Sequence, residues 1–192
     1  MRVLAFDTAT SVTTVAIVRD GELLGELRAE HASRLLEAVD ELVEDPQAID
    51  AIAVGTGPGS FTSIRIGLAA ARALALALDV PVAGVSTLDA LAAGAPGATP
   101  VVDARRGEVF ALVDGQARVL APGELDVTGR TLVGDGAIRY REAFATAEIP
   151  PDQSELHVPR ARFHAKLARE FGDADAVEPI YLRVPDAEKN VR

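Results

Sequence analysis

The sequence predicts an α/β protein of two lobes, because its two halves open in the same way. Each half begins with an apolar strand that ends at or near an aspartate, Asp7 in the first half and Asp103 in the second. In each half, two further strand-like runs follow, and an Asp-Gly pair joins them, at 20–21 and at 114–115. Asp-Gly between apolar runs is a strong signal for a two-residue hairpin turn. Helical patterns then alternate with strands, which is typical of α/β proteins.

The first lobe is predicted to be a meander of strands followed by helical crossovers. Its strands are expected over 3–6, 12–18, 23–27, 49–54 and 81–85. A first helix is indicated by apolar residues at the spacing of one buried stripe: Leu35, Leu36, Val39, Leu42 and Val43. A second helix is expected over 62–78, and a third begins after Ser86, a suitable N-cap. This order is characteristic of the ribonuclease-H-like fold found in actin-like and sugar-kinase-like proteins.

The second lobe begins with the same meander and is then shorter. A stretch rich in Ala and Gly at 93–98 predicts the linker. The strands that follow are expected over 99–102, 108–113, 118–120 and 131–133, and the helices near 138–147 and over 160–171. We therefore predict two ribonuclease-H-like lobes of the actin-like ATPase (ASKHA) class, at 1–98 and 99–192, the second of them reduced.

Composition and charge exclude several classes of protein. The chain has 192 residues, 48% of them hydrophobic, and no cysteine, which excludes disulfides, thiolate zinc sites and a cysteine nucleophile. No apolar run is free of charges over the roughly 18 residues of a membrane span, so we expect a cytoplasmic protein without a membrane anchor. A net charge of -10 would repel phosphate backbones, so unaided tight binding of RNA or DNA is not expected.

A glycine-rich loop, GTGPGS at 55–60, lies between a predicted strand and a predicted helix. Such a loop indicates close approach of the backbone to a phosphate or to another chain. It lacks the lysine of a Walker loop, and no acid follows at the end of the next strand as in a dinucleotide site. Two interpretations of this loop stay open: a tight turn in which Ser60 or Thr62 caps the helix, or a loop that contacts a nucleotide. The residues that would contact a nucleotide are Asp7, Thr8, Gly57, Gly59, Ser60 and Asp103.

The helix expected over 62–78 is apolar on almost every face. From residue 64 onward its only charges are Arg65 and Arg72, seven residues apart and therefore on one side. A helix of this kind is central in a large protein or is covered by another chain. A two-lobed chain of this length has little core with which to cover every face. We therefore predict a subunit interface on this helix.

The histidines and acids form no recognised catalytic motif. His31, His157 and His164 lack the spacing of a helical zinc pair. We interpret His31 as a cap or surface residue, and His157 and His164 as surface residues. Asp7 and Asp103, at matching strand ends, could share a magnesium ion. This leaves a magnesium-dependent actin-like phosphotransferase as the alternative function. Because no phosphate-binding lysine accompanies the two acids, we expect no catalytic residue and no metal site of the chain's own.

Several segments, taken in order, resemble a known family. They are Phe6–Thr10, Gly55–Gly67, Ser86–Leu88, Asp103–Phe110 and Pro179–Arg183. Together they resemble the TsaB (YeaZ) family, bacterial subunits of the machinery that makes threonylcarbamoyladenosine in tRNA. The resemblance spans almost the whole chain. Ser63 stands where a glycine is usual in the family, and the second lobe is short.

The resemblance implies an actin-like fold without activity of its own. The catalytic paralogue, TsaD, carries a His-x-x-x-His metal pair at the start of the equivalent first helix, whereas here Leu35 follows four residues after His31. The resemblance implies a heterodimer with a TsaD-like catalytic subunit through the first two helices. Its expected interface residues are His31, Leu35, Leu36, Val39, Leu42, Ile64, Arg65, Gly67, Leu68, Ala70, Ala71, Arg72 and Leu74.

The resemblance also implies further partners. A TsaE-like ATPase would join at the junction of the pair, and tRNA would be engaged only through the assembled complex. ATP or ADP and magnesium would act at the level of the complex, with no cofactor belonging to this chain. A homodimer of the lone chain, through the same apolar helix, stays open.

Overall fold

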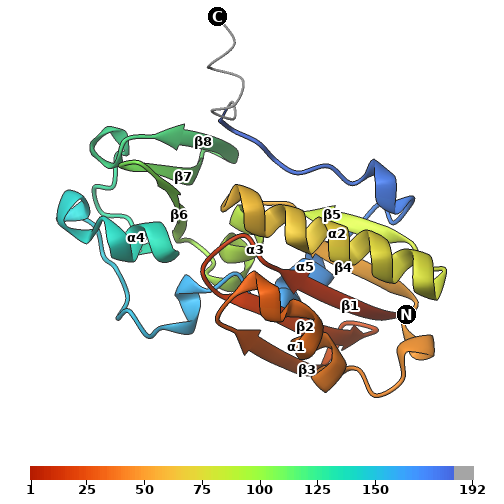
Figure 1. The fold of residues 1–192 in the computed structure, drawn as a ribbon. Helices are drawn as coiled ribbons and strands as arrows, with labels where there is room; N and C mark the ends of the chain where they lie inside the picture. The colour runs from red at the N-terminus through yellow and green to blue at the C-terminus, as the bar shows by residue number, and fades with distance from the viewer. Residues whose placement is uncertain (184–192) are drawn as a thin grey trace, which may run out of the picture.

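The computed structural model describes residues 1–183, which form two sheets with helices packed against them (Figure 1). The first sheet has the strand order β3-β2-β1-β4-β5. The strands β1, β2 and β3 are antiparallel, and β4 and β5 add in parallel. Their bounds are β1 Arg2–Asp7, β2 Thr13–Arg19, β3 Glu22–Ala29, β4 Ala51–Gly55 and β5 Val82–Val85. This is the predicted meander followed by parallel strands.

Helices cover both faces of the first sheet. Helices α1 (Leu35–Leu42) and α2 (Phe61–Leu78) pack on one face, where they bury residues of β1, β2 and β4. Helix α5 (Ala161–Leu167) packs on the opposite face (Figure 1). Helix α3 (Thr87–Gly94) leads out of this layer into the second sheet, and the Ser86 hydroxyl caps it by accepting from the Asp89 N–H.

The second sheet is smaller, with the order β8-β7-β6-β9. Its strands are β6 Thr99–Arg105, β7 Glu108–Val113, β8 Gln116–Leu120 and β9 Leu132–Val133. The short helix α4 (Asp135–Arg139) packs against β6, and an apolar cluster around Phe144 completes the core. The predicted α/β class with a reduced second lobe is confirmed.

Two helix predictions differ from the structure. The helix expected near 138–147 is α4 followed by a separate one-turn helix at Arg141–Phe144, with the break at Tyr140, whose hydroxyl donates to Asp103. The helix expected over 160–171 ends at Leu167, because the chain then becomes extended and Gly172 exchanges backbone hydrogen bonds with Val82. The other one-turn helices span Ala32–Arg34, Pro46–Ala48, Pro122–Glu124, Glu155–His157 and Ala174–Ala176.

Helix α5 is anchored to the first sheet by a buried glutamate. The Oε2 atom of Glu26, in β3, accepts from the Nε atoms of Arg160 at 2.8 Å and Arg162 at 2.7 Å. Burial alone would raise the pKa of Glu26, but the hydrogen bonds from the two arginines outweigh it and hold that pKa below its ordinary value. A segment from beyond residue 98 therefore packs with the first sheet, and the division into lobes at 1–98 and 99–192 stays a prediction.

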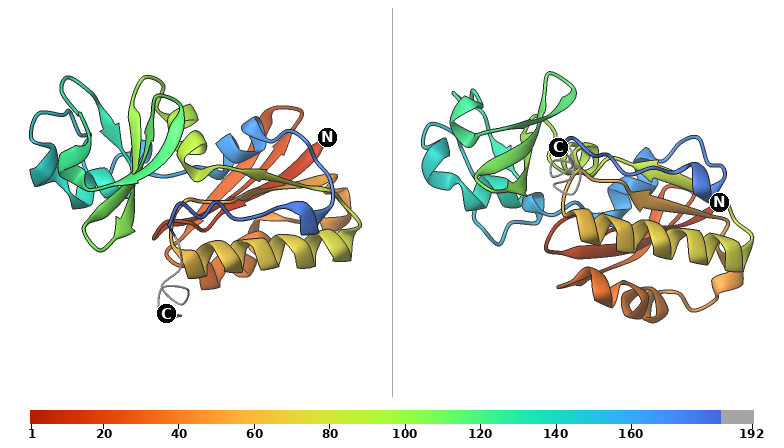
Figure 2. Two further views of the ribbon diagram at one scale, coloured as in Figure 1. Left: turned by 90° about the horizontal axis from the view of Figure 1, so that it is seen from above. Right: turned by 45° about the horizontal axis from the view of Figure 1, so that its top comes forward.

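The segment 172–183, which we call the C-terminal strap, runs beside α2 and spans the two lobes (Figure 2). At the first sheet, the Ile180 N–H donates to the Thr56 carbonyl at 2.8 Å. At the second sheet, Arg183 forms an ion pair with Glu108. The strap therefore ties the two sheets together through its own backbone and side chains.

Candidate partner interface and strand-end centres

The start of α2 packs closely on the loop that follows β1. The Ser60 hydroxyl caps the helix by accepting from the Ser63 N–H at 3.4 Å. The Thr8 hydroxyl donates to the Ser63 carbonyl at 2.6 Å, and a Cβ on Gly67 would lie 2.5 Å from that same hydroxyl. A glycine is therefore needed at position 67 so that α2 can pack closely against Thr8 of the same chain. The Ser63 hydroxyl lies 2.9 Å from Ser60 Oγ, so it belongs to the cap.

The glycine loop also packs on its own chain. The Ser60 N–H donates to the Ala9 carbonyl at 2.7 Å, and a Cβ on Gly59 would collide with that carbonyl. The Gly57 carbonyl accepts from the Thr87 N–H at 2.8 Å. These contacts support the interpretation as a tight strand-to-helix turn. The nucleotide-contacting role of Gly57, Gly59 and Ser60 stays a prediction.

The structure divides α2 into a core face and an outer face. The expected interface residues Ile64, Gly67, Leu68 and Ala71 lie on the core face, and Ala70 and Leu74 are partly buried. By length and composition, α2 is the one helix of the described chain that could cross a membrane, a property that core helices of folded domains share. Its core face packs on the first sheet.

The outer face of α2 was not identified from the sequence. It consists of Ile66, Ala69, Ala73, Leu76 and Ala77, all exposed. Ile66 is 39% exposed and Leu76 is 87% exposed. Because both faces of the helix are apolar, hydrophobic periodicity carries no signal for which residues face outward.

The residues expected on the first helix are divided in the same way. Leu35 and Val39 are buried in the core, and Leu42 is partly buried against it. Leu36 is 58% exposed, and His31 is an exposed residue whose side chain makes no capping hydrogen bond. Only Leu36 and His31 of this set are therefore available to a partner in the present conformation.

The two charges of α2 hold the C-terminal strap. Arg65 Nε donates to the Tyr181 hydroxyl at 2.9 Å, and its guanidinium lies 3.8 Å from the centre of the Phe61 ring. Arg72 Nη2 donates to the Val177 carbonyl at 3.1 Å. The predicted interface positions Arg65 and Arg72 therefore already have partners within the chain, although both stay exposed.

At the end of β1, Asp7 is wholly buried and has several partners. Its Oδ1 accepts from the Ala9 N–H at 2.6 Å, and its Oδ2 accepts from the Thr87 hydroxyl at 2.6 Å. His164 Nε2 lies 2.8 Å from Oδ2, off the line of a straight hydrogen bond. Asp7, Thr87 and His164 are each 0% exposed. This centre joins β1, α3 and α5 and is closed to solvent.

The expectation that His157 and His164 lie on the surface is wrong. His157 is 5% exposed, its Nδ1 accepts from the Gly134 N–H at 3.1 Å, and its Nε2 lies 3.1 Å from the Pro150 carbonyl oxygen. Nε2 therefore carries the proton of this ring. Both histidines are buried because partners distant in sequence surround them, and sequence spacing does not reveal such partners.

Asp103, in β6 of the second sheet, has a different set of partners. Its Oδ1 accepts from the Arg105 N–H at 2.8 Å and the Tyr140 hydroxyl at 3.1 Å, and its own N–H donates to Asp135 at 2.9 Å. Burial raises the pKa of Asp135, and the nearby charge of Asp103 raises it further. Within residues 1–183, no group of three or more His, Asp or Glu side chains is placed to hold a metal ion.

The chain is similar to one family model and to several curated proteins. The family model described as "TsaD: tRNA N6-adenosine threonylcarbamoyltransferase" matches residues 25–171. The tRNA threonylcarbamoyladenosine biosynthesis protein TsaB of Bacillus subtilis is 38% identical over 57% of this chain, and that of Escherichia coli is 43% identical over 57%. Each match spans 53% of the relative, about half its length. An uncharacterized protein of Mycobacterium tuberculosis is 39% identical over 96% of this chain and 93% of its own length.

Solved structures agree with the sequence comparison. The ethanolamine utilization protein EutJ of Carboxydothermus hydrogenoformans superposes with a TM-score of 0.51 at 10% identity over 84% of this chain and 89% of its own, which shows a shared fold alone. YeaZ of Pseudomonas aeruginosa superposes with a TM-score of 0.76 at 31% identity, over 94% of this chain and 99% of its own. The chain therefore belongs to the TsaB (YeaZ) family of tRNA threonylcarbamoyladenosine biosynthesis proteins, and its fold is the actin-like, ribonuclease-H-like fold of that family.

Proposed function

We propose that the chain is a non-catalytic subunit that pairs with a TsaD-like catalytic subunit. In this role it supports transfer of threonylcarbamoyl from its adenylate to the adenosine beside the tRNA anticodon. The observation that carries the proposal is the outer face of α2, where Leu76 is 87% exposed on a helix whose other face is in the core. Contiguous exposed apolar surface of this kind marks interaction sites.

The energetics of this face favour a partner. Full burial of a large aliphatic side chain is worth about 1.5–3 kcal/mol, and the outer face leaves Ile66 and Leu76 in water. Between them lie the exposed alanines Ala69 and Ala73, small enough for another helix to approach closely. Leu36, 58% exposed, belongs to α1, the helix that lies on the same side of the sheet as α2 (Figure 1). In the absence of the catalytic subunit, a second copy of this chain would cover the same surface.

The non-catalytic role is supported by the state of the candidate catalytic groups. Both Asp7 oxygens accept hydrogen bonds from buried groups, so the carboxylate is occupied in holding the fold. His31 stands alone, because the position four residues later is the buried Leu35. In the proposal, a TsaE-like ATPase joins the heterodimer, ATP or ADP and magnesium act in that assembly, and tRNA is bound by the assembly.

Isothermal titration of the TsaD-like subunit of the same organism into this chain tests the proposed interface. The variants Ile66→Glu and Leu76→Glu place a charge on the outer face, and both side chains are exposed, so the folded chain tolerates them. Leu156→Glu is the matched control, because Leu156 is 39% exposed, as Ile66 is, but lies in the one-turn helix Glu155–His157 and not in α2. We expect the α2 variants to lose binding and the control to keep it. Equal binding by all three variants would overturn the proposed interface.

A further inference from the structure

The hairpin between β6 and β7 has an unusual turn. Three consecutive residues lie in the left-handed region of backbone space: Arg105 at φ 62°, Arg106 at φ 57° and Gly107 at φ 77°. Turns of this conformation favour Asn, Asp and Gly, because these residues adopt positive φ most easily. The two other hairpins, at 20–21 and 114–115, both use Asp-Gly at positive φ. The arginines are therefore not explained by the needs of the turn, and such departures are found at functional sites.

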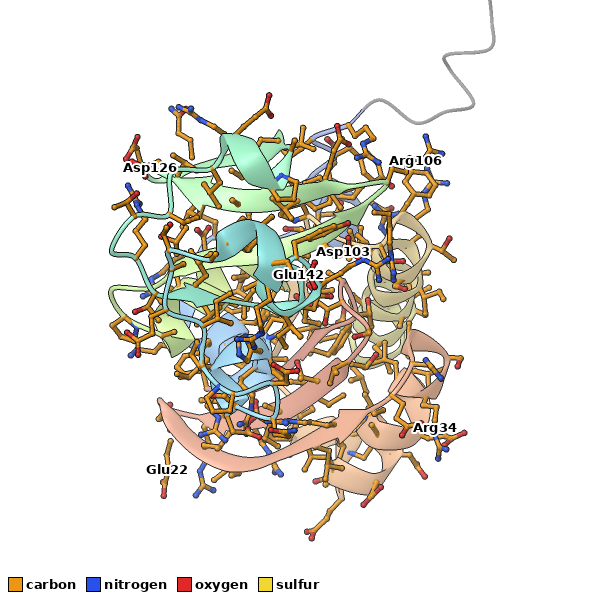
Figure 3. All side chains as sticks on the ribbon, turned by 90° about the vertical axis from the view of Figure 1, so that its left-hand side faces the viewer. Glu22, Arg34, Asp103, Arg106, Asp126 and Glu142 are labelled. Carbon is orange, nitrogen blue, oxygen red and sulfur yellow. The ribbon has the colours of Figure 1, made fainter. Side chains whose placement is uncertain are left out.

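A buried carboxylate fixes the position of one of these arginines and of a third one. Asp103 Oδ2 lies 3.3 Å from Arg105 Nη1 and 3.4 Å from Arg139 Nε, and the Asp103 side chain is 5% exposed. The Arg105 and Arg139 side chains are themselves 66% and 56% exposed. Arg105 comes from the hairpin and Arg139 from the end of α4, so two distant elements bring their guanidinium groups to one place. Figure 3 labels Asp103 and Arg106, which lie on the same side of the second lobe.

The charge of this cluster differs from that of the whole chain. Arg105 and Arg139 share the single carboxylate of Asp103, and Arg106 is their exposed neighbour in the hairpin, while burial raises the pKa of the nearby Asp135. The chain as a whole carries a net charge of -10, so its remaining surface repels polyanions. A cluster of exposed arginines is therefore where such a chain could contact a phosphate backbone.

The chemistry of the cluster favours phosphate over a protein surface. The planar guanidinium group presents paired N–H donors that match the oxygens of a phosphate. The large apolar side chains that are exposed within residues 1–183 lie on other elements, and none is in this hairpin or in α4. A protein-binding hot spot is usually built around a buried aromatic or aliphatic anchor, which this cluster lacks.

We propose that Arg105, Arg106 and Arg139 form a binding site for phosphate oxygens of the RNA backbone. The contact is independent of base sequence, because arginines on phosphates fix position without reading bases. Asp103 is a positioning residue that holds Arg105 and Arg139 in place. The inference rests on the proposed function only for the identity of the RNA, which would be the tRNA bound by the assembled complex.

Fluorescence anisotropy of labelled tRNA with the complex of this chain and the TsaD-like subunit tests the site. We expect the double variant Arg105→Ala/Arg139→Ala to bind about tenfold more weakly and to lower the slope of log affinity against log salt by about two. Arg130→Ala is the matched control, an exposed arginine of the same lobe outside the cluster. The double variant Arg105→Lys/Arg139→Lys keeps the charges, and we expect it to recover most of the salt slope.

The outcome separates this inference from the proposed function. If the complex of the double alanine variant has the wild-type mass and circular dichroism, yet binds tRNA with wild-type affinity and salt slope, the phosphate site is refuted. If the wild-type complex does not form, the proposed function fails, and the same titration on the lone chain at low salt tests the site. In that titration of the lone chain, equal affinity of the wild type and the double variant for tRNA also refutes the phosphate site. A loss of tRNA affinity confined to the double variant supports the site.

Discussion

Replacing Asp7 with alanine distinguishes a structural carboxylate from a catalytic one. In the folded chain this carboxylate accepts from the Ala9 N–H and the Thr87 hydroxyl and lies 2.8 Å from His164 Nε2, all at 0–1% exposure. The variant would leave two buried donors, the Ala9 N–H and the Thr87 hydroxyl, without an acceptor. An orphaned buried donor costs about 1–3 kcal/mol.

The penalties share one carboxylate and are not additive, so we expect a loss of about 4 kcal/mol in the free energy of unfolding. For a protein of this size, that loss lowers the melting temperature by roughly 8–16 °C. Asp7→Asn keeps one carbonyl oxygen, and we expect it to lose about half as much. Urea unfolding followed by circular dichroism measures both variants, and differential scanning calorimetry checks the shift in melting temperature.

Asp126→Ala is the matched control for this experiment. Asp126 also accepts from the backbone N–H two residues later, that of Thr128 at 3.1 Å, but it lies on the surface (Figure 3). We expect this variant to cost less than about 1 kcal/mol. If Asp7→Ala is as stable as the control, the structural account of Asp7 is refuted. If it also abolishes an ATP hydrolysis activity of the lone chain, the phosphotransferase alternative is supported.

Three further predictions concern the fold and the interface. The arginine partners of Glu26 lower its pKa in the folded state. The ionised Glu26 therefore stabilises the fold at a pH above its pKa in the unfolded chain, and this stabilisation is lost as the pH falls through its pKa in the folded chain. The difference in unfolding free energy between wild type and Glu26→Gln should therefore shrink below about pH 4 in a urea series; a constant difference would contradict this. Gly67→Ala should destabilise by about 1 kcal/mol or more in the same assay, because its methyl group would crowd the Thr8 hydroxyl, and unchanged stability would refute the close contact. Ala71 is 1% exposed and Ala73 is exposed, because the two residues lie half a turn apart on α2. Ala71→Glu should therefore unfold the chain. Ala73→Glu should stay folded but no longer co-elute with the catalytic subunit in size-exclusion chromatography.

Local signals in the sequence predict much of the fold. The Asp-Gly pairs fix two hairpins, and the hydroxyl of Ser86 caps α3 as expected. These signals act within a few residues, so one sequence is enough to interpret them. Helix α5 is shorter than predicted because the pairing of Gly172 with Val82, ninety residues earlier in the chain, replaces its last turn.

The candidate site is less predictable, because its determinants are long-range. The apolar sequence of α2 indicates an interface but not which face is outward, and the tertiary packing of Leu68 on the first sheet decides this. His164 is buried because Asp7, far away in the sequence, lies beside it. The clustering of Arg105 with Arg139 likewise depends on how α4 packs against β6.

The most direct test of the central claim is the mass of the assembly in solution. Light scattering coupled to size-exclusion chromatography would compare this chain, the TsaD-like subunit of the same organism, and their mixture. We predict a new species with the summed mass, which Leu76→Glu abolishes and Leu156→Glu preserves. Two separate peaks at the individual masses, with and without ATP, would contradict the claim that this chain works by covering its outer α2 face with the catalytic subunit.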